Sequence, residues 1–166
     1  MTKMSSLLKR ARETLKIEIA GLESLIGRLD SQFEEAVNLL FCCRGKVILT
    51  GMGKSGLIAQ KIAATLTSTG TPALFLHAGE STHGDLGIIT KQDVVIAFSY
   101  SGETIEVVQM IGHIQVIGVP LIAMTGKPES TLGQSATVHL SIAVEKEACP
   151  LGLTPTASST VTLALG

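Results

Sequence analysis

The first part of the chain shows the hydrophobic spacing of an α-helix. Over residues 3–43, apolar side chains recur at alternating intervals of four and three, which is typical of an amphipathic helix or a coiled-coil seam. Asp30 and Ser31 followed by Glu34 form a helix-capping signal, so we expect two helices with a break near residue 30. The seam would either pack on the core of its own domain or contact another subunit. Its members are Leu15, Ile19, Leu22, Ile26, Leu29, Phe33, Ala36 and Leu40.

From residue 45 the period changes, and short continuous apolar runs alternate with segments of helical spacing. Such runs predict strands that are buried on both faces, as in parallel sheets. Because parallel strands need crossover connections, the alternation predicts an α/β fold: a three-layer, doubly wound, flavodoxin-like sheet of five parallel strands with helices at the N-terminus. The predicted strands are 46–50, 72–77, 93–99, 119–125 and 137–142, and the predicted helices are Ser55–Ser68, Glu103–Gln115, Glu129–Gln134 and Ser158–Leu165.

The length and the charge distribution indicate one domain with two unlike parts. The chain has 166 residues, of which 45% are apolar and 16% charged, so it can bury a sizeable core. Residues 1–44 carry thirteen of the 27 charged side chains and all four arginines, whereas residues 45–166 hold fifteen of the seventeen glycines and no arginine. We interpret 1–44 as a helical arm of the same domain and 45–166 as its α/β body. The last helical run ends without a capping pattern, so we expect the natural polypeptide to continue.

Composition also argues against several classes of function. Thirteen basic against fourteen acidic residues, with only five aromatics, do not indicate a nucleic-acid partner. No apolar run approaches the roughly 18 residues of a membrane span, so no membrane partner is expected. Three cysteines, two of them adjacent, make a poor disulfide framework, and the N-terminus lacks an apolar secretory segment. We therefore expect reduced thiols and a cytoplasmic protein, with Cys149 packed beside Pro150.

The turn after the first predicted strand is rich in glycine. Gly51, Gly53 and Gly56 match the pattern G-x-G-x-x-G between a strand and a helix, which is used to bind dinucleotides. That site also needs a carboxylate about 20 residues on, at the end of the second strand, where this sequence has His77. A Walker A loop is excluded because Ile48 occupies the position of its first glycine. The dinucleotide interpretation is therefore weak.

A second loop, SYSGET (99–104), also follows a predicted strand and precedes a helix. Ser99, Ser101 and Thr104 offer three hydroxyls, Gly102 lets the backbone approach a ligand closely, and the helix N-terminus adds free N–H groups. This set suits a single phosphate group better than a dinucleotide. Further hydroxyls at expected strand or helix ends are those of Ser55, Thr125 and Ser158.

Five segments of the chain carry a family resemblance. They are GMGKSG (51–56), HAGESTHGDLG (77–87), SYSGETIE (99–106), TGKPES (125–130) and VEKEACPLGLTPTASSTVTLALG (144–166). Together they resemble the sugar isomerase (SIS) domain, whose members bind phosphosugars through such a Ser/Thr loop. SGET is common to the superfamily, while HGDLG and KEACPLGLTPTASST are similar to the branch of the D-arabinose-5-phosphate isomerases in particular.

The resemblance implies an aldose–ketose isomerase that interconverts D-ribulose 5-phosphate and D-arabinose 5-phosphate, the entry to the eight-carbon sugar acid Kdo of lipopolysaccharide. Such enzymes are usually homotetramers with a following pair of CBS domains. The family also has a functional histidine in a later S-H-P-G-G stretch, beyond Gly166. We therefore expect this chain to keep its substrate pocket, and to lack activity where that later stretch is absent. Two alternatives stay open: a non-catalytic phosphosugar sensor, and an SIS isomerase of another sugar phosphate.

Isomerisation moves a proton between C1 and C2 through an enediolate, which requires a base, a partner for the oxyanion and a proton relay. It requires no nicotinamide or metal, so no cofactor or metal site is expected. Glu147 is the first candidate base and Glu106 the second, both at acidic positions that matter in the family. Lys54 would hold the phosphate or the enediolate oxygen, because a cation at a helix start is unfavourable unless an anion faces it. His83 would relay a proton.

Each of these assignments has a plainer interpretation. Glu106 lies in a first helical turn, where a carboxylate complements the helix dipole, and Glu147 and Lys54 could be solvated charges. The residues expected to contact the substrate and its phosphate are Gly53, Ser55, Ser99, Ser101, Gly102, Glu103, Thr104, His77, Thr125 and Ser158.

Overall fold

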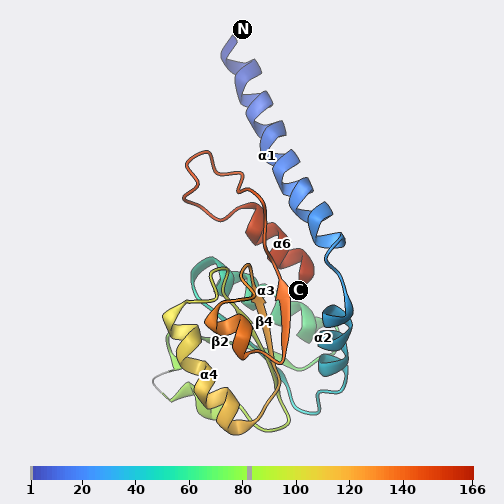
Figure 1. The fold of residues 1–166 in the computed structure, drawn as a ribbon, viewed down its shortest axis with the longest axis vertical. Coiled ribbons are helices and arrows are strands. Elements are labelled where there is room, and N and C mark those ends of the chain that lie inside the picture. The colour runs from blue at the N-terminus through green and yellow to red at the C-terminus, as the bar shows by residue number, and fades with distance from the viewer. Residues whose placement is uncertain (1, 82–83) are drawn as a thin grey trace.

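The computed structural model describes residues 2–81 and 84–166, and its helices and strands alternate as expected (Figure 1). Every predicted element is present, and its ends differ from the prediction by no more than two residues. The strands are β1 (Val47–Gly51), β2 (Ala73–His77), β3 (Val94–Phe98), β4 (Leu121–Thr125) and β5 (Val138–Ser141). The helices are α1 (Thr2–Ile26), α2 (Ser31–Phe41), α3 (Gly53–Ser68), α4 (Ile105–Ile117), α5 (Thr131–Ser135) and α6 (Ala157–Leu165), with a short 3-10 helix η2 (Asp85–Ile88).

All strand pairs are parallel, and their order is β2-β1-β3-β4-β5. This is the flavodoxin-like order expected from the sequence. The direction of winding reverses between β1 and β3, so the helices that follow these two strands cover opposite faces of the sheet. Helices α1, α2, α3 and α6 contribute to the core on one face, and α4 and α5 to the core on the other.

Alternate residues of each central strand enter the two cores. Leu49 and Ile96 belong to the core beneath α3, whereas Ile48 and Val95 belong to the core beneath α4. All four are buried, and burial of such a side chain contributes about 1.5–3 kcal/mol. This two-sided burial explains why the strands read as continuous apolar runs and not as alternating patterns.

The N-terminal arm breaks where the capping signal predicts. The N–H of Gln32 donates to the carboxylate of Asp30, the N-cap of α2, at 2.9 Å. The second half of α1 packs along α6, and Gly21 permits this close approach because a Cβ there would lie 3.2 Å from Val161. The first half of α1 extends away from the body (Figure 1). Within the described ranges, no helix is both long and apolar enough to cross a bilayer.

The seam predicted along the arm is only partly covered by the core of its own domain. Leu22, Ala36 and Leu40 pack against the core of their own domain. Leu15 and Ile26 stay 62% and 70% exposed, and Ile19 and Leu29 are also exposed. Part of the seam therefore remains without a cover in the single chain.

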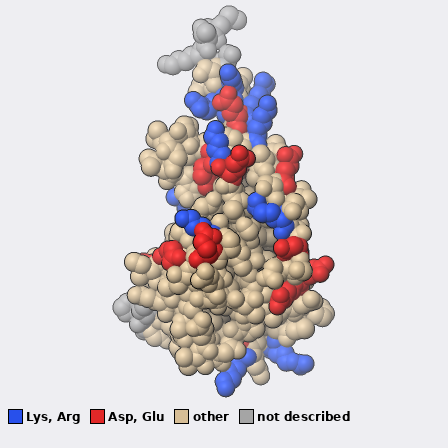
Figure 2. All heavy atoms as spheres, in the orientation of Figure 1, with Lys and Arg blue, Asp and Glu red and all other residues tan. Residues whose placement is uncertain are grey.

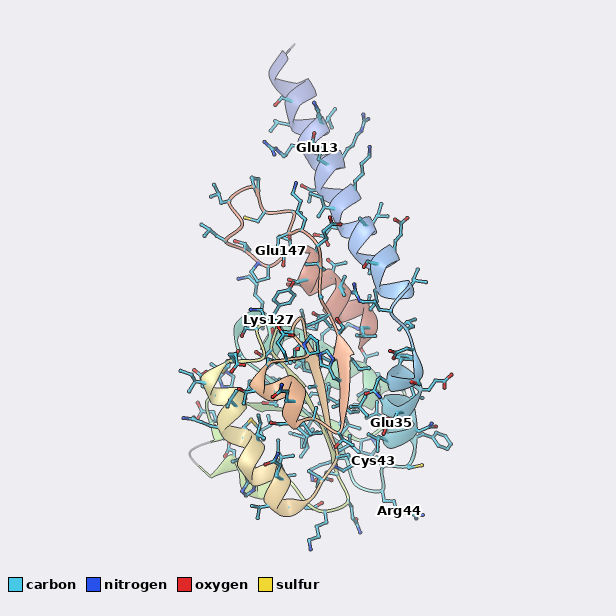
Figure 3. The ribbon with its side chains drawn as sticks, viewed as in Figure 1. Glu13, Glu35, Cys43, Arg44, Lys127 and Glu147 are labelled. Carbon is cyan, nitrogen blue, oxygen red and sulfur yellow. The ribbon has the colours of Figure 1, made fainter. Side chains whose placement is uncertain are left out.

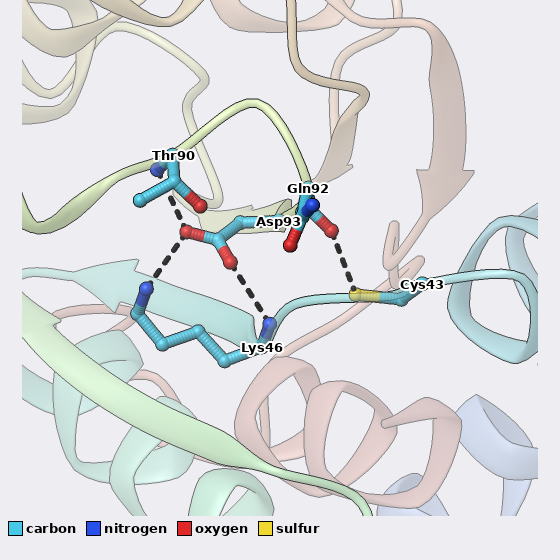
Figure 4. Close-up of polar contacts among 5 residues, drawn as sticks. All are labelled: Cys43, Lys46, Thr90, Gln92 and Asp93. Carbon is cyan, nitrogen blue, oxygen red and sulfur yellow. Dashed lines mark hydrogen bonds and ion pairs between the residues drawn. The ribbon is translucent and has the colours of Figure 1, made fainter.

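A buried ion pair joins the beginnings of the strands β1 and β3, at the end of the sheet opposite the candidate site (Figure 4). Lys46 Nζ lies 2.8 Å from Asp93 Oδ2, and the backbone N–H of Lys46 donates to Asp93 Oδ1 at 2.9 Å. The N–H of Thr90 donates to Oδ2 at 2.8 Å. Burial raises the pKa of Asp93, but the hydrogen bonds from Lys46 and Thr90 outweigh it and lower the pKa below its usual 3.8.

Candidate functional site

The candidate site lies at the carboxyl ends of β1 and β3, where the winding of the sheet reverses. In open α/β sheets ligands bind at this switch point. The turn 51–56 leaves β1 for α3, and the loop 99–104 leaves β3 for α4. Gly53 has a φ of +53°, which brings the chain sharply from the strand into the helix. The side chain of Lys54 then projects into solvent, and that of Ser55 is half-buried.

Within the loop 99–104, the hydroxyls of Ser99 and Thr104 contact each other, and that of Ser101 accepts a backbone N–H. Ser99 is buried, its Oγ lies 2.8 Å from Thr104 Oγ1, and it accepts the N–H of Gly102 at 3.1 Å. The Oγ of Ser101 accepts the N–H of Glu103 at 3.2 Å, while Ser101 itself is exposed. The first N–H groups of α4 have no acceptor inside the helix. Hydroxyls and N–H groups are thus concentrated in one loop at a helix N-terminus, which is a common setting for phosphate binding.

Gly102 is essential to this loop for two reasons. Its φ of +69° is a conformation that side chains rarely adopt, and a Cβ at this position would collide with the hydroxyl of Ser130. The glycine therefore permits both the turn and its contact with the loop after β4.

Lys54 and His77 line one open groove of about 520 Å³, together with Gly53 and Phe75. His77 ends β2, its Nδ1 accepts the N–H of Gly79 at 3.2 Å, and its ring meets Phe75 edge-on at 6.1 Å between centroids. The structure thus places Lys54 and His77 on the same groove. His83, the predicted proton relay, lies outside the described residues.

Thr125, predicted to contact the phosphate, is fully buried and its hydroxyl already has partners. It donates to the carbonyl of Lys127 at 2.8 Å, accepts the N–H of Lys127 at 2.9 Å, and lies 3.0 Å from His139 Nε2. Burial lowers the pKa of His139, which favours the neutral ring. In this geometry Thr125 shapes the loop after β4 and does not present its hydroxyl to a ligand.

Glu147 lies on the loop that leads from β5 into α6 (Figure 3). Its Oε2 accepts the N–H of Thr156 at 2.8 Å, the hydroxyl of Thr156 at 2.8 Å and the N–H of Ser158 at 3.3 Å. Burial raises the pKa of Glu147, but the hydrogen bonds from Ser158 and Thr156 outweigh it, so the net shift lowers the pKa below 4.5. These three bonds end on Oε2, and the side chain of Ser158 also stabilises the charged carboxylate. Glu147 is thus neither a freely solvated charge nor a buried one; it is an ionised carboxylate held in place by α6.

Glu106 lies half-buried in the first turn of α4, two residues after Thr104. Ser158 is buried at the start of α6, next to Glu147. Glu147, Cys149 and residues of α1 border a groove of about 420 Å³ whose α1 side carries Arg10 and Lys16. Figure 2 shows the same concentration of charge along the arm, above a mostly uncharged body.

Cys149 does not have the packing role that the sequence predicted for it. Its side chain is only half-buried, and backbone N–H groups of Leu153, Leu151 and Thr154 surround the sulfur and lower its pKa to about 7. A thiol of this pKa is partly thiolate at neutral pH. Within the described ranges, no group of three or more His, Cys, Asp or Glu side chains could hold a metal ion.

The single chain brings some predicted site residues together and separates others. Ser99, Ser101 and Thr104 form one set, and Lys54 and His77 form a second beside it. Glu147 belongs to the loop after β5, which is one edge of the sheet, whereas His77 ends β2, the other edge. Glu147 is nevertheless held at the start of α6, which packs against α3, the helix whose first turn carries Lys54.

The fold and the loop at its switch point define a class of α/β domains with anion-binding geometry. Within that class the chain belongs to the SIS domain family, which matches residues 39–166.

The chain is also similar to named proteins of this family. It is 48% identical over its full length to the arabinose 5-phosphate isomerase KdsD of Pseudomonas aeruginosa, and 52% identical over 155 residues to KdsD of Escherichia coli K12. It spans 51% and 47% of these two proteins, about half the length of each. A solved structure of E. coli CFT073 c3406 in complex with arabinose 5-phosphate is 41% identical with a TM-score of 0.92, covering 99% of this chain and 87% of the other.

Sequence reasoning missed one contact of the site. The carboxylate of Glu103 accepts the N–H of Thr131 at 2.7 Å and so points toward α5. The two residues are 28 positions apart, and no local pattern announces such a pairing. The two residues meet because the strands that precede them, β3 and β4, are neighbours in the sheet.

Proposed function

We propose that this chain is the isomerase domain of an arabinose 5-phosphate isomerase, which interconverts D-ribulose 5-phosphate and D-arabinose 5-phosphate. The observation that carries the proposal is the identity of about 50% to two KdsD isomerases along the chain. The hydroxyl set of the loop 99–104 supports it independently, because it offers donors to one phosphate without an arginine.

The proposed reaction uses the chain's residues in three roles. Ser101, Thr104 and the N-terminus of α4 bind the phosphate, and Lys54 stabilises the oxyanion of the enediolate. Glu147 removes the proton from C2 of the aldose, or from C1 of the ketose in the reverse direction. Its carboxylate is held for this step by the start of α6. His83 and Glu106 move the proton between the two oxygens. The enediolate then receives the proton on the neighbouring carbon, and no electrons leave the sugar.

Exchange of the C2 proton tests this proposal directly. The full-length polypeptide that carries this chain is incubated with D-arabinose 5-phosphate in deuterated water, and the C2 proton signal is followed by NMR. We expect its loss at a rate that depends on enzyme concentration. Binding of the sugar phosphate without any exchange would contradict the isomerase and leave a phosphosugar sensor. Faster exchange with a hexulose 6-phosphate would contradict the choice of substrate.

Removal of the loop hydroxyls is expected to weaken substrate binding. In Ser101→Ala/Thr104→Ala, the phosphate loses two hydrogen-bond donors, so KM should rise by about 10- to 100-fold while kcat changes little. Steady-state kinetics give both constants. Ser68→Ala, a hydroxyl on the far end of α3, is the matched control. A fall in kcat with unchanged KM would contradict the assignment of these hydroxyls to the phosphate.

We also propose that the chain assembles into a homotetramer through its arm. The exposed part of the seam, which begins with Leu15 and Ile19, supports this interpretation because apolar side chains at helical spacing are stable when another surface covers them. Leu15→Asp/Ile19→Asp should shift the molecular mass in light scattering from that of the assembly to that of a smaller species. An unchanged mass, or a monomeric wild-type chain, would contradict the proposal.

The same proposal assigns the reaction to a pathway and to a compartment. D-Arabinose 5-phosphate would feed the synthesis of Kdo for lipopolysaccharide. The three free cysteines are consistent with a reducing compartment, so we place the reaction in the cytoplasm.

A further inference from the structure

The loop that offers hydroxyls to the phosphate is joined to the loop after β4 by three hydrogen bonds. The N–H of Gly126 donates to the carbonyl of Tyr100 at 2.9 Å, and the N–H of Leu132 donates to the carbonyl of Gly102 at 3.1 Å. The third is the bond from the N–H of Thr131 to Glu103 Oε1, at 2.7 Å. Of the three, only the last depends on a side chain, so it is the one that a substitution can remove.

Glu103 is fixed at both its backbone and its side chain. Its N–H donates to Ser101 Oγ at 3.2 Å, and its carboxylate is the acceptor for Thr131. The hydrogen bonds from Thr131 lower the pKa of Glu103, and the charge of Lys127 acts in the same direction, so the carboxylate is ionised at neutral pH. A bond to an ionised acceptor is the stronger kind.

This arrangement also directs a negative charge away from the phosphate site. Glu103 lies between Ser101 and Thr104 in sequence, so a freely rotating carboxylate could approach a bound phosphate and repel it. The contact with Thr131 keeps the carboxylate on the side of α5. Two effects therefore favour ligand binding. The loop is ordered before the ligand arrives, and the negative charge of Glu103 is kept away from the negatively charged phosphate.

We propose that Glu103 is a positioning residue that holds the loop 99–104 in its phosphate-binding form through the N–H of Thr131, and that it does not contact the substrate. The proposal rests on the proposed function for its kinetic consequences. It replaces the expectation from the sequence that Glu103 belongs among the substrate-binding residues.

Three substitutions separate this role from direct binding. Phosphate binding is measured on the 166-residue chain, and kcat and KM are measured on the full-length polypeptide. Glu103→Ala removes the acceptor, and Glu103→Gln keeps an acceptor oxygen at the same place without its charge. Thr131→Pro removes the donor. Thr131 is the first residue of α5, where proline is tolerated, and Ser130 before it has φ −69° and ψ 162°, which a following proline favours. Glu129→Ala, a neighbouring exposed carboxylate, is the control for a change of net charge.

Binding of inorganic phosphate is measured by NMR titration of the backbone N–H signals of Ser101 and Thr104, and kcat and KM by the isomerase assay. We expect Glu103→Ala and Thr131→Pro each to raise the phosphate Kd and KM by about 3- to 10-fold, with kcat within about twofold of wild type. Glu103→Gln should lie closer to wild type, and Glu129→Ala should match it. The double variant Glu103→Ala/Thr131→Pro should be no weaker than Thr131→Pro alone, because both changes remove one contact.

Three outcomes would overturn the proposal. Unchanged phosphate binding in Glu103→Ala would show that the contact does not order the loop. Additive effects in the double variant would show that the two residues act separately. Equal losses in Glu103→Gln and Glu103→Ala, with Thr131→Pro like wild type, would mean that the carboxylate itself contacts the ligand. Because phosphate binding is measured without turnover, failure of the full-length polypeptide to exchange the C2 proton would refute the isomerase, while the role of Glu103 would still be tested by the phosphate Kd.

Discussion

Replacing Glu147 by glutamine is expected to lower kcat by about 10²- to 10⁴-fold with little change in KM. Glutamine keeps an oxygen that can accept the N–H groups of Thr156 and Ser158, so the start of α6 is preserved. It cannot accept a proton from carbon. The loss should therefore fall on the chemical step, which steady-state kinetics and the rate of C2 proton exchange both measure.

Glu145→Gln is the matched control, since Glu145 is an exposed carboxylate two residues away in the same loop. An unchanged kcat in Glu147→Gln would contradict the assignment and move the role of the base to Glu106. The pH dependence gives a second check. A base must be ionised, and the pKa of Glu147 is held below 4.5 by its bonds to Ser158 and Thr156, which outweigh burial. Protonation of Glu147 should therefore reduce kcat/KM only below about pH 4.5.

Asp93→Asn is expected to reduce the free energy of unfolding by about 2–4 kcal/mol. The Asp93 side chain is 1% exposed and Lys46 is 27% exposed, so the substitution leaves an ammonium group facing a neutral amide in a poorly solvated place. Asparagine also has only one oxygen to accept the N–H groups of Lys46 and Thr90. Urea unfolding followed by circular dichroism measures the difference.

The same pair predicts how stability varies with pH. The pKa of Asp93 is lower in the folded chain than its usual 3.8, so its contribution is fully present above that value and is lost as pH falls through the folded pKa. Asp93→Asn should therefore flatten the decline in stability as the pH falls below about 4. Asp85→Asn, at an exposed aspartate, is the control. Equal stability of Asp93→Asn and wild type at pH 7 would contradict this account of the ion pair.

The sequence predicted the elements of the fold well because burial on both faces of a parallel sheet leaves a simple pattern. The run KVILT and the capping signal at Asp30 are local features, because each depends on residues that are close together in the sequence. The order of the strands followed from the alternation of strand and helix together with the known preference for doubly wound sheets.

The candidate site was less predictable, because its contacts join distant segments. The hydroxyls at 99–104 are neighbours in sequence and were identified there. The bond between Glu103 and Thr131 and the three bonds to Glu147 depend on the packing of loops, and nothing in either local sequence distinguishes these carboxylates from solvated ones. Thr125 illustrates the converse: it lies at a strand end, as a ligand hydroxyl would, but the loop after β4 uses its hydroxyl internally.

The strand order also has a consequence for how the chain folds. Strands β1 and β3 are neighbours inside the sheet, and their first residues, Val47 and Val94, lie side by side although α3 and β2 separate them in sequence. Lys46 and Asp93, which precede this pair, are 47 residues apart. Closing a flexible loop of that length costs about 3 kcal/mol of chain entropy before the central contacts form. The central pair of the sheet therefore depends on the meeting of two distant segments, which slows folding relative to a fold built from local contacts, and β2, the strand next in sequence to β1, joins an edge of the sheet.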